Sequence, residues 1–120
     1  MRAFELMIIL EAEVDEADVT ARIDQVTQNI TANSGGEVKT EDRWGKRRFA
    51  YEINHQQEGY YVVLEFVTEA REMESLQRLL QLADDVVRHK IIRLPDKEAA
   101  KRGLFGVEMP LVTAGQPKET

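Results

Sequence analysis

The fold of this chain is decided by residues 37–67, EVKTEDRWGKRRFAYEINHQQEGYYVVLEFV. Residues 37–53 are typical of one long, irregular strand, in which Gly45 is the expected site of a bulge. Residues 54–59 are polar and favour a hairpin loop, whereas residues 60–67 alternate as a second strand does. The pattern therefore predicts two antiparallel strands at the centre of the chain.

A strand and a helix are predicted before this hairpin. Residues 2–10 alternate, and the face expected to point inward carries Phe4, Leu6, Ile8 and Leu10. Asp15 is the predicted N-cap of the helix, because Glu16 and Asp18 then lie at the positive end of its dipole. An amphipathic stripe follows at Val19, Ile23, Val26 and Ile30. Gly35 and Gly36 are expected to end the helix.

A second helix and a last strand are predicted after the hairpin. Thr68 is the expected N-cap, with Glu69 and Glu72 in the first helical turn. The apolar stripe of this helix consists of Met73, Leu76, Leu80 and Ala83. Residues 86–94 then form the predicted last strand, which Pro95 closes.

The predicted order of elements is strand, helix, strand, strand, helix, strand. Short connections and right-handed crossovers favour an α+β ferredoxin-like sandwich of the split βαβ type. Such a sandwich has a four-stranded antiparallel sheet with both helices on one face. We predict one domain over residues 1–95. Residues 96–120 lose the periodicity and collect glycine and proline, so we expect an extended, flexible C-terminal tail there.

The composition is that of a globular domain, with 42% hydrophobic residues, 32% charged residues and no cysteine. The lack of cysteine excludes disulfides and thiol nucleophiles. His55 and His89 lack the spacing of a metal site, and no carboxylate pair suits acid/base chemistry. We expect no metal, no cofactor, no small-molecule substrate and no catalytic residue. No targeting or membrane-spanning segment is evident, which agrees with a cytoplasmic location.

The net charge of −6 argues against a nucleic-acid partner, but the charges are unevenly distributed. Residues 43–51, RWGKRRFAY, mix cations with aromatic rings, as phosphate contact and base stacking require. Strict alternation divides this segment into one face with Trp44, Lys46 and Arg48 and another with Arg47, Phe49 and Tyr51. A bulge at Gly45 would change that division. The alternative is an edge strand whose charges protect it against aggregation.

The sheet face without helices is predicted to carry apolar side chains at Met7, Ile9, Tyr61 and Val63. Such a patch usually marks a partner surface, although single exposed apolar residues are also normal. Arg88 and Lys90 share one face of the last strand and either extend the basic area or are solvated charges. Leu104 and Phe105 would either anchor the tail on a partner or fold back onto the sheet of the domain.

Four segments, in order, resemble the bacterial small-subunit ribosomal protein S-six family: residues 2–6 (RAFEL), 45–53 (GKRRFAYEI), 58–61 (EGYY) and 85–89 (DVVRH). The resemblance spans about residues 2–94. It implies a ferredoxin-like fold and a structural role in the small ribosomal subunit, where the family binds small-subunit ribosomal RNA together with ribosomal protein S-eighteen. The chain ends in PKET, without the acidic run to which glutamates are added in some members.

The resemblance and the charge pattern together define the expected contacts. The cations expected to bind ribosomal RNA are Arg2, Arg43, Lys46, Arg47, Arg48 and Arg88. The residues expected to bind the partner protein are Tyr61, Val63, Leu104 and Phe105. Two other classes of function remain open. One is a small-molecule-sensing domain that dimerises through its open sheet, and the other is a cofactor-free enzyme, for which no acid or histidine pair is visible.

Overall fold

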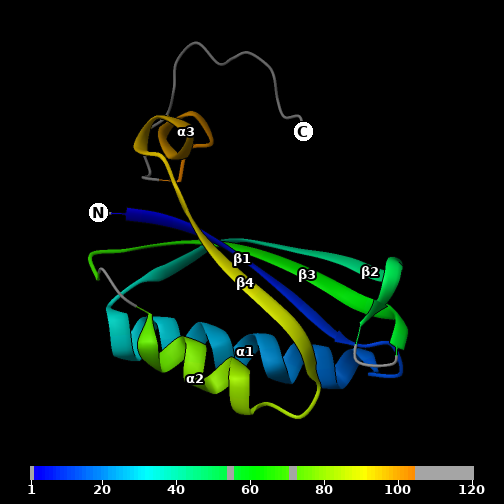
Figure 1. Ribbon diagram of the computed structural model, residues 1–120. Helices are drawn as coiled ribbons and strands as arrows, with labels where there is room; N and C mark the ends of the chain where they lie inside the picture. Colours follow the sequence, from blue (N-terminus) through cyan, green and yellow to red (C-terminus); the bar gives the residue numbers. More distant parts are fainter. Residues whose placement is uncertain (1, 54–55, 71–72, 105–120) are drawn as a thin grey trace.

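The computed structural model describes residues 2–53, 56–70 and 73–104 of the 120-residue chain. Its elements are β1 (Arg2–Glu11), α1 (Glu16–Ser34), β2 (Glu37–Ile53), β3 (Gln56–Thr68), α2 (Glu74–Leu82), β4 (Val86–Leu94) and α3 (Asp96–Lys101). The strands form one antiparallel sheet in the order β2-β3-β1-β4, and α1 and α2 lie together on one face of it (Figure 1). This arrangement is the predicted ferredoxin-like fold.

Helix α1 begins and ends as predicted. The Asp15 carboxylate accepts a 2.9 Å hydrogen bond from the backbone N–H of Asp18 at the first turn. Gly35 ends the helix with a φ of 66°, in the left-handed region that favours glycine. Gly36 lies so close to β3 that a Cβ atom there would come within 2.5 Å of the Val67 carbonyl oxygen. The two glycines therefore end the helix and let the chain return to the sheet.

Helix α2 begins later than predicted, and Thr68 is not its N-cap. Thr68 is the last residue of β3, where it pairs with Arg2 and is fully buried. Its Oγ1 accepts a 3.1 Å hydrogen bond from the backbone N–H of Ala70, which forms a local turn. The helix starts at Glu74 instead. The prediction was wrong because a threonine suits a strand end as well as a helix cap, and pairing with the full length of β1 extends β3.

Strand β3 also starts earlier than predicted. It begins at Gln56, so most of the predicted loop over residues 54–59 belongs to the strand. Residues 54–55 lie outside the described part of the chain. The hairpin formed by β2 and β3 is therefore longer and has a shorter connection than the polar composition suggests.

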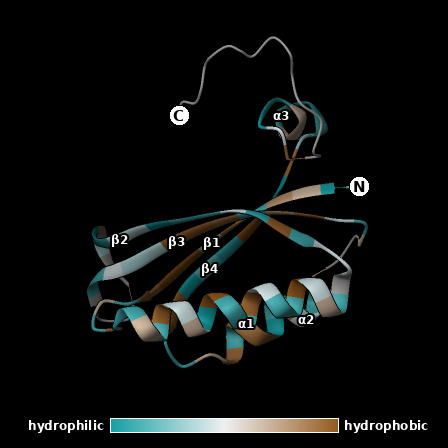
Figure 2. Ribbon diagram, turned by 180° about the vertical axis from the view of Figure 1, so that it is seen from behind, coloured by the Kyte–Doolittle hydropathy of each residue, from teal (hydrophilic) through white to brown (hydrophobic). Residues whose placement is uncertain are grey.

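The main hydrophobic core lies between the sheet and the two helices, and the predicted inward faces are confirmed. Its buried members are Phe4, Leu6, Ile8, Leu10, Val19, Ile23, Val26, Ile30, Tyr60, Val62, Leu64, Phe66, Met73, Leu76 and Leu80. Ala83 follows α2 instead of belonging to it. Figure 2 shows that the central strands β1 and β3 are largely hydrophobic, whereas the edge strand β2 is largely hydrophilic.

The sequence predicted an extended chain from Asp96 onward, and this prediction was wrong for the first residues, which form a helix. Pro95 ends β4, but a proline suits the start of a helix because it has no N–H to leave unpaired, and α3 follows at once. A second cluster of buried side chains joins α3 to the sheet: Ala3, Val67, Leu94, Ala99 and Leu104. The division of the chain at residue 95 stays a prediction. The predicted tail over residues 105–120 lies outside the described residues.

Ion pairs around Arg102 fasten α3 to the sheet. Its Nε donates to Glu98 over 2.8 Å, and its Nη1 contacts Glu65 and lies 3.6 Å from Glu5. The hydrogen bond with Glu98 raises the pKa of Arg102 and lowers the pKa of the Glu98 carboxyl group. Because Glu5 and Glu65 belong to adjacent central strands, α3 covers one end of the sheet face opposite α1 and α2 (Figure 1).

Candidate nucleic-acid and protein interface

The sheet face opposite α1 and α2 is covered by α3 at one end only. We call the uncovered remainder the open face. It carries three exposed large hydrophobic side chains, Trp44, Tyr51 and Ile92, which are 46%, 69% and 41% exposed. Since large apolar groups are normally removed from water, their gathering on one side of a sheet indicates a contact surface.

A bulge in β2 determines which side chains reach the open face. Arg43 pairs with Val62, but Gly45 pairs with Tyr61, so β2 has one extra residue at this point. Gly45 has a φ of 86°, which glycine adopts without strain. Residues after the bulge therefore change faces relative to strict alternation. The division of this segment predicted from strict alternation is corrected accordingly: Trp44, Arg47, Phe49 and Tyr51 lie on the same face.

An aromatic cluster forms around Tyr61 as a result. The Trp44 and Tyr61 rings stack with centroids 6.0 Å apart, and Phe49 meets Tyr61 edge-on at 6.2 Å. Gly59, next to Tyr61, leaves room for the cluster, because a Cβ atom there would lie 2.5 Å from Ile9 and 2.8 Å from Phe49. These contacts hold Phe49 almost buried while Trp44 stays half-exposed.

A hollow with a volume of about 340 Å³ opens beside this cluster. Its lining residues are Met7, Ile9, Phe49, Tyr51, Tyr61, Arg88, His89 and Lys90. Apolar and aromatic groups come from β1, β2 and β3, whereas the basic groups come from β4. The hollow is therefore suited to a partner that offers both apolar surface and negative charge.

Three basic side chains border the open face. The Arg47 guanidinium lies 5.8 Å from the centroid of the Trp44 ring, at cation–π distance. Arg88 pairs with Ile9 and Lys90 pairs with Met7, so both project on the same side as the hollow. Neither Arg88 nor Lys90 has an ion-pair partner among the described residues. These cations are available to an anionic ligand.

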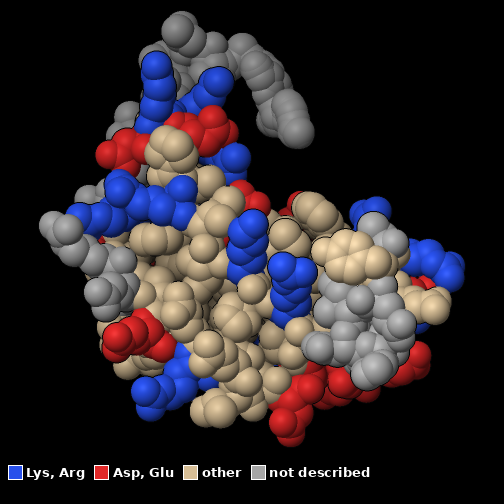
Figure 3. Space-filling model, viewed as in Figure 1, with Lys and Arg blue, Asp and Glu red and all other residues tan. Residues whose placement is uncertain are grey.

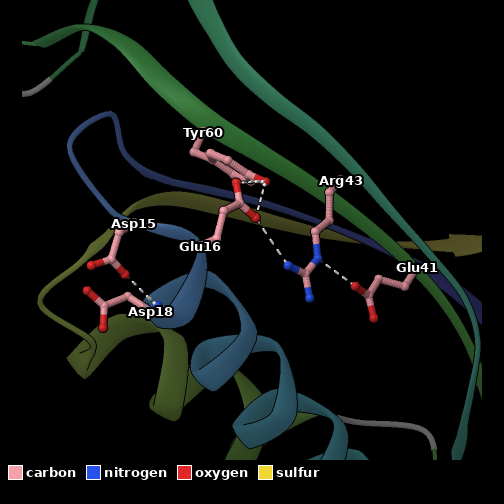
Figure 4. A network of polar contacts seen from close by, with 6 residues as sticks. All are labelled: Asp15, Glu16, Asp18, Glu41, Arg43 and Tyr60. Atoms are coloured by element: carbon pink, nitrogen blue, oxygen red, sulfur yellow. Dashed lines mark hydrogen bonds and ion pairs between the residues drawn. The ribbon is translucent and has the colours of Figure 1, made fainter.

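Arg43, in contrast, lies on the helix side of the sheet in a polar network (Figure 4). Its Nε donates to Glu41 over 2.7 Å, and its Nη1 lies 3.4 Å from a Glu16 carboxylate oxygen. The Tyr60 hydroxyl donates to the same carboxylate over 2.9 Å. Burial and the bond to Glu16 raise the pKa of Tyr60, and the bond to Glu41 raises the pKa of Arg43.

The other predicted RNA contacts are also dispersed. Arg2 donates from Nη1 to the Glu69 carbonyl oxygen over 3.1 Å, at the far end of β1. Lys46 and Arg48 are exposed and pair in register with Tyr60 and Glu58, which places them opposite the open face. Of the six predicted cations, only Arg47 and Arg88 reach the open face. The sequence did not group Trp44 with Arg47 and Phe49, because that grouping depends on the Gly45 bulge. It left open whether Lys90 extends the basic area, and the pairing of β4 with β1 places Lys90 beside Arg88 on the open face.

Most acidic side chains lie away from the basic border of this surface, although the Asp42 carboxylate accepts a 3.1 Å hydrogen bond from the Trp44 ring N–H. In Figure 3, Lys and Arg side chains lie over the middle of the sheet, and the largest group of Asp and Glu side chains lies near the start of α1, with other acidic groups beside α3. The first turn of α1 contains Glu16 and Asp18. Because the Debye length is about 8 Å at physiological salt, separated acidic groups weaken the basic border of the open face only slightly.

The predicted contacts to a partner protein differ in their surroundings. Tyr61 and Val63 are half-buried on the open face, where the prediction placed them. Leu104 is only 2% exposed and packs against the sheet of its own chain, so its assignment to a partner contact is corrected. Burial of this apolar side chain within the chain already removes it from water. Phe105 lies outside the described residues.

The described residues give little support to other kinds of chemistry. No group of three or more metal-ligating side chains occurs among them. Burial lowers the pKa of His89, and His55 lies outside the described residues. None of the described helices is both long and apolar enough to cross a membrane.

A ferredoxin-like sandwich with a half-covered sheet and a basic, aromatic open face defines a small binding module. The family model described as Ribosomal protein S6 matches residues 3–93. The chain therefore belongs to the ribosomal protein S6 family, as the sequence resemblance indicated. It is a structural protein of the small ribosomal subunit and not an enzyme.

Individual relatives agree with the family match. The small ribosomal subunit protein bS6 of Carboxydothermus hydrogenoformans is 50% identical over 93 residues, which cover 78% of this chain and 96% of the relative. That of Symbiobacterium thermophilum is 44% identical over 93 residues, or 78% of this chain and 97% of the relative. The crystal structure of 30S ribosomal protein S6 from Thermotoga maritima superposes with a TM-score of 0.76 at 28% identity, covering 84% of this chain and 94% of that chain.

Proposed function

We propose that this protein binds small-subunit ribosomal RNA together with ribosomal protein S-eighteen in the bacterial cytoplasm, and that its open face is the joint binding surface. The observation that carries the proposal is the grouping of cations and aromatic rings on the open face of a chain whose net charge is −6. An acidic protein that concentrates its available cations in one place directs polyanions to that place.

The phosphate contacts are assigned first to Arg47, Arg88 and Lys90, which border the open face. Lys46 and Arg48 are exposed on the other side of β2 and extend the contact around the sheet edge. Arg2 and Arg43 are hydrogen-bonded within the chain and only partly exposed, so the proposal gives them no phosphate. Arg48 donates to Gln57 over 3.4 Å but stays exposed, so it is retained. Because RNA affinity grows with the number of cations that contact phosphates, a protein with few available cations is expected to need a second protein for firm RNA binding.

The partner protein is assigned to the apolar part of the same face. Tyr61, Val63 and Trp44 offer a half-exposed apolar surface. Protein interfaces favour aromatic residues at their centre with polar and charged residues at the rim, and this surface has that arrangement. Docking of S-eighteen here would place its own groups beside Arg47 and Arg88. The RNA site would then be completed by both proteins.

The alternative of a small-molecule sensor rests on the hollow, whose volume of about 340 Å³ lies within the range of ligand sites. Family membership favours the ribosomal proposal. Self-association without any effect of RNA or S-eighteen would favour the alternative.

The proposal is tested by measuring binding to small-subunit ribosomal RNA over a salt series, with and without S-eighteen. We expect firm binding only with S-eighteen, and Arg47→Ala and Arg88→Ala should each reduce the slope of log K against log salt. The reduction should be about 0.7 to 0.9 per lost phosphate contact. Lys97→Ala, which removes an exposed cation from α3, is the matched control and should leave the slope unchanged. Absence of RNA binding under both conditions would contradict the proposal.

A further inference from the structure

Two consecutive residues at the β2 bulge, Arg43 and Trp44, point to opposite faces of the sheet and have different surroundings. Arg43, just before the bulge, lies on the helix side and is held by Glu16 and Glu41 (Figure 4). Trp44 lies on the open face and stacks on Tyr61. The pairing of β2 with β3 shifts register at three places, and at the one between Arg43 and Gly45 the backbone is fixed from both faces of the sheet.

The bulge decides what the open face displays. A shift of one residue in a strand moves every later side chain to the opposite face. If β2 lost the extra residue, Arg47, Phe49 and Tyr51 would turn toward the helix side. Lys46 and Arg48 would then occupy the open face, and the aromatic cluster would lose Phe49. The composition of the proposed binding surface thus depends on one local register.

The contacts of Arg43 suit a role in holding that register. Its guanidinium bridges Glu41 of its own strand, at 2.7 Å, and Glu16 of α1, at 3.4 Å. Glu16 is in turn fixed by the buried Tyr60 through a hydrogen bond of 2.9 Å from the Tyr60 hydroxyl. Tyr60 pairs with Lys46, on the other side of the bulge from Arg43. The network therefore connects α1 to the hairpin on both sides of the bulge.

We infer that Arg43 is a positioning residue: through Glu16, Glu41 and Tyr60 it holds β2 in the bulged register and so keeps Arg47 and the aromatic cluster on the open face. The inference rests on the proposed function for its consequence in RNA binding. It gives Arg43 a role different from the phosphate contact that its place in the basic segment suggests. Two carboxylates beside its guanidinium also make the local potential unfavourable for a phosphate.

The salt series separates the two roles. Arg43→Met should weaken RNA binding in the presence of S-eighteen by roughly two- to fivefold, the range of a partly exposed ion-pair network, with the slope of wild type. Arg47→Met, the matched variant, should weaken binding and also reduce the slope. Arg43→Lys should resemble Arg43→Met, because a lysine keeps the charge but cannot bridge two carboxylates as a guanidinium does.

A phosphate contact would give the opposite pattern. Arg43→Met would then lower the slope as much as Arg47→Met, and Arg43→Lys would retain most of the binding, since lysine also binds phosphate. Either that pattern or an unchanged affinity of Arg43→Met would overturn the inference.

A measurement on the free protein keeps the inference testable if RNA binding itself fails. Trp44 is the single tryptophan of the chain, so its fluorescence reports on the bulge directly. Arg43→Met and the milder Glu16→Gln should shift this signal while the far-ultraviolet spectrum stays that of a folded protein. Asp24→Asn, which removes an exposed carboxylate elsewhere on α1, should leave it unchanged. If wild type binds no RNA, the proposed function fails and the salt series gives no information on Arg43. In that case an unchanged Trp44 signal in Arg43→Met overturns the positioning role.

Discussion

Trp44 stacks on Tyr61 with nearly parallel rings, 6° between their planes and 6.0 Å between their centroids. The direct partner of Tyr61 in the sheet is Gly45, not Trp44. Gly45 adopts a φ of 86° at the bulge, and this backbone conformation lets the neighbouring Trp44 ring lie over Tyr61. Two glycines, Gly45 and Gly59, therefore permit the aromatic cluster, one by its backbone and the other by its small size.

The two glycines should respond differently to substitution by alanine. A Cβ atom at Gly59 would clash with Ile9 and Phe49 and lie 3.1 Å from the Leu10 carbonyl oxygen, so Gly59→Ala should lower the free energy of unfolding by about 3 kcal/mol. Gly45→Ala meets open space and should cost only about 1 kcal/mol of backbone strain. Urea unfolding measures both values, and Trp44 fluorescence should change more in Gly59→Ala. Equal losses for the two variants would contradict this account of the cluster.

The packing of α3 can be tested with a pair of leucines. Leu104 is 2% exposed in the second hydrophobic cluster, whereas Leu82 at the end of α2 is 74% exposed. Leu104→Ala should lower the free energy of unfolding by about 2 to 3 kcal/mol, because it leaves a cavity between α3 and the sheet. Leu82→Ala should change it by no more than about 0.5 kcal/mol. Equal effects in urea unfolding would mean that α3 is not packed as described.

The fold was predictable because its signals are local and agree with one another. Alternation in β1, the Asp15 cap and the stripe from Val19 to Ile30 each specify one element, and the short connections leave one topology. Two errors have local causes. Thr68 suits either a cap or a strand end, and Pro95 suits either a strand end or a helix start, so only pairing and packing decide between them.

The site was less predictable because it depends on register shifts in one strand, above all the one at Gly45. Gly45 was recognised as the place for a bulge, but the sequence does not show whether the bulge forms, and every assignment after it depends on that. Arg43 illustrates a second difficulty. Its carboxylate partner Glu16 lies on a different element, and sequence alone does not show that the two side chains meet. A cation in a basic segment can thus serve the fold rather than a ligand.

The ionisation of Tyr60 should be displaced from that of the other tyrosines. Burial and the carboxylate of Glu16 favour its neutral form, so its pKa in the folded protein lies above the unfolded value of 10.0. The unfolded state therefore loses this proton first, and stability falls as the pH rises from about 10 toward the folded pKa. Tyr60→Phe should remove this part of the alkaline destabilisation. Tyrosinate absorbance and urea unfolding across this range measure both effects, and a variant with the same alkaline loss as wild type would contradict the shift.

The apolar part of the open face should respond to loss of its largest exposed ring. Trp44→Ala should weaken the affinity for S-eighteen by about 2 kcal/mol, or roughly thirtyfold, because truncated aromatic anchors of protein interfaces commonly cost this much. Leu82→Ala is the matched control, since it truncates an equally apolar and more exposed side chain on the helix side of the sheet. Isothermal titration calorimetry suits the measurement, because Trp44→Ala removes the only tryptophan and with it the fluorescence signal. If both variants bind S-eighteen as wild type does, S-eighteen docks on another surface. The cations of the open face would then have to bind RNA without a neighbouring S-eighteen.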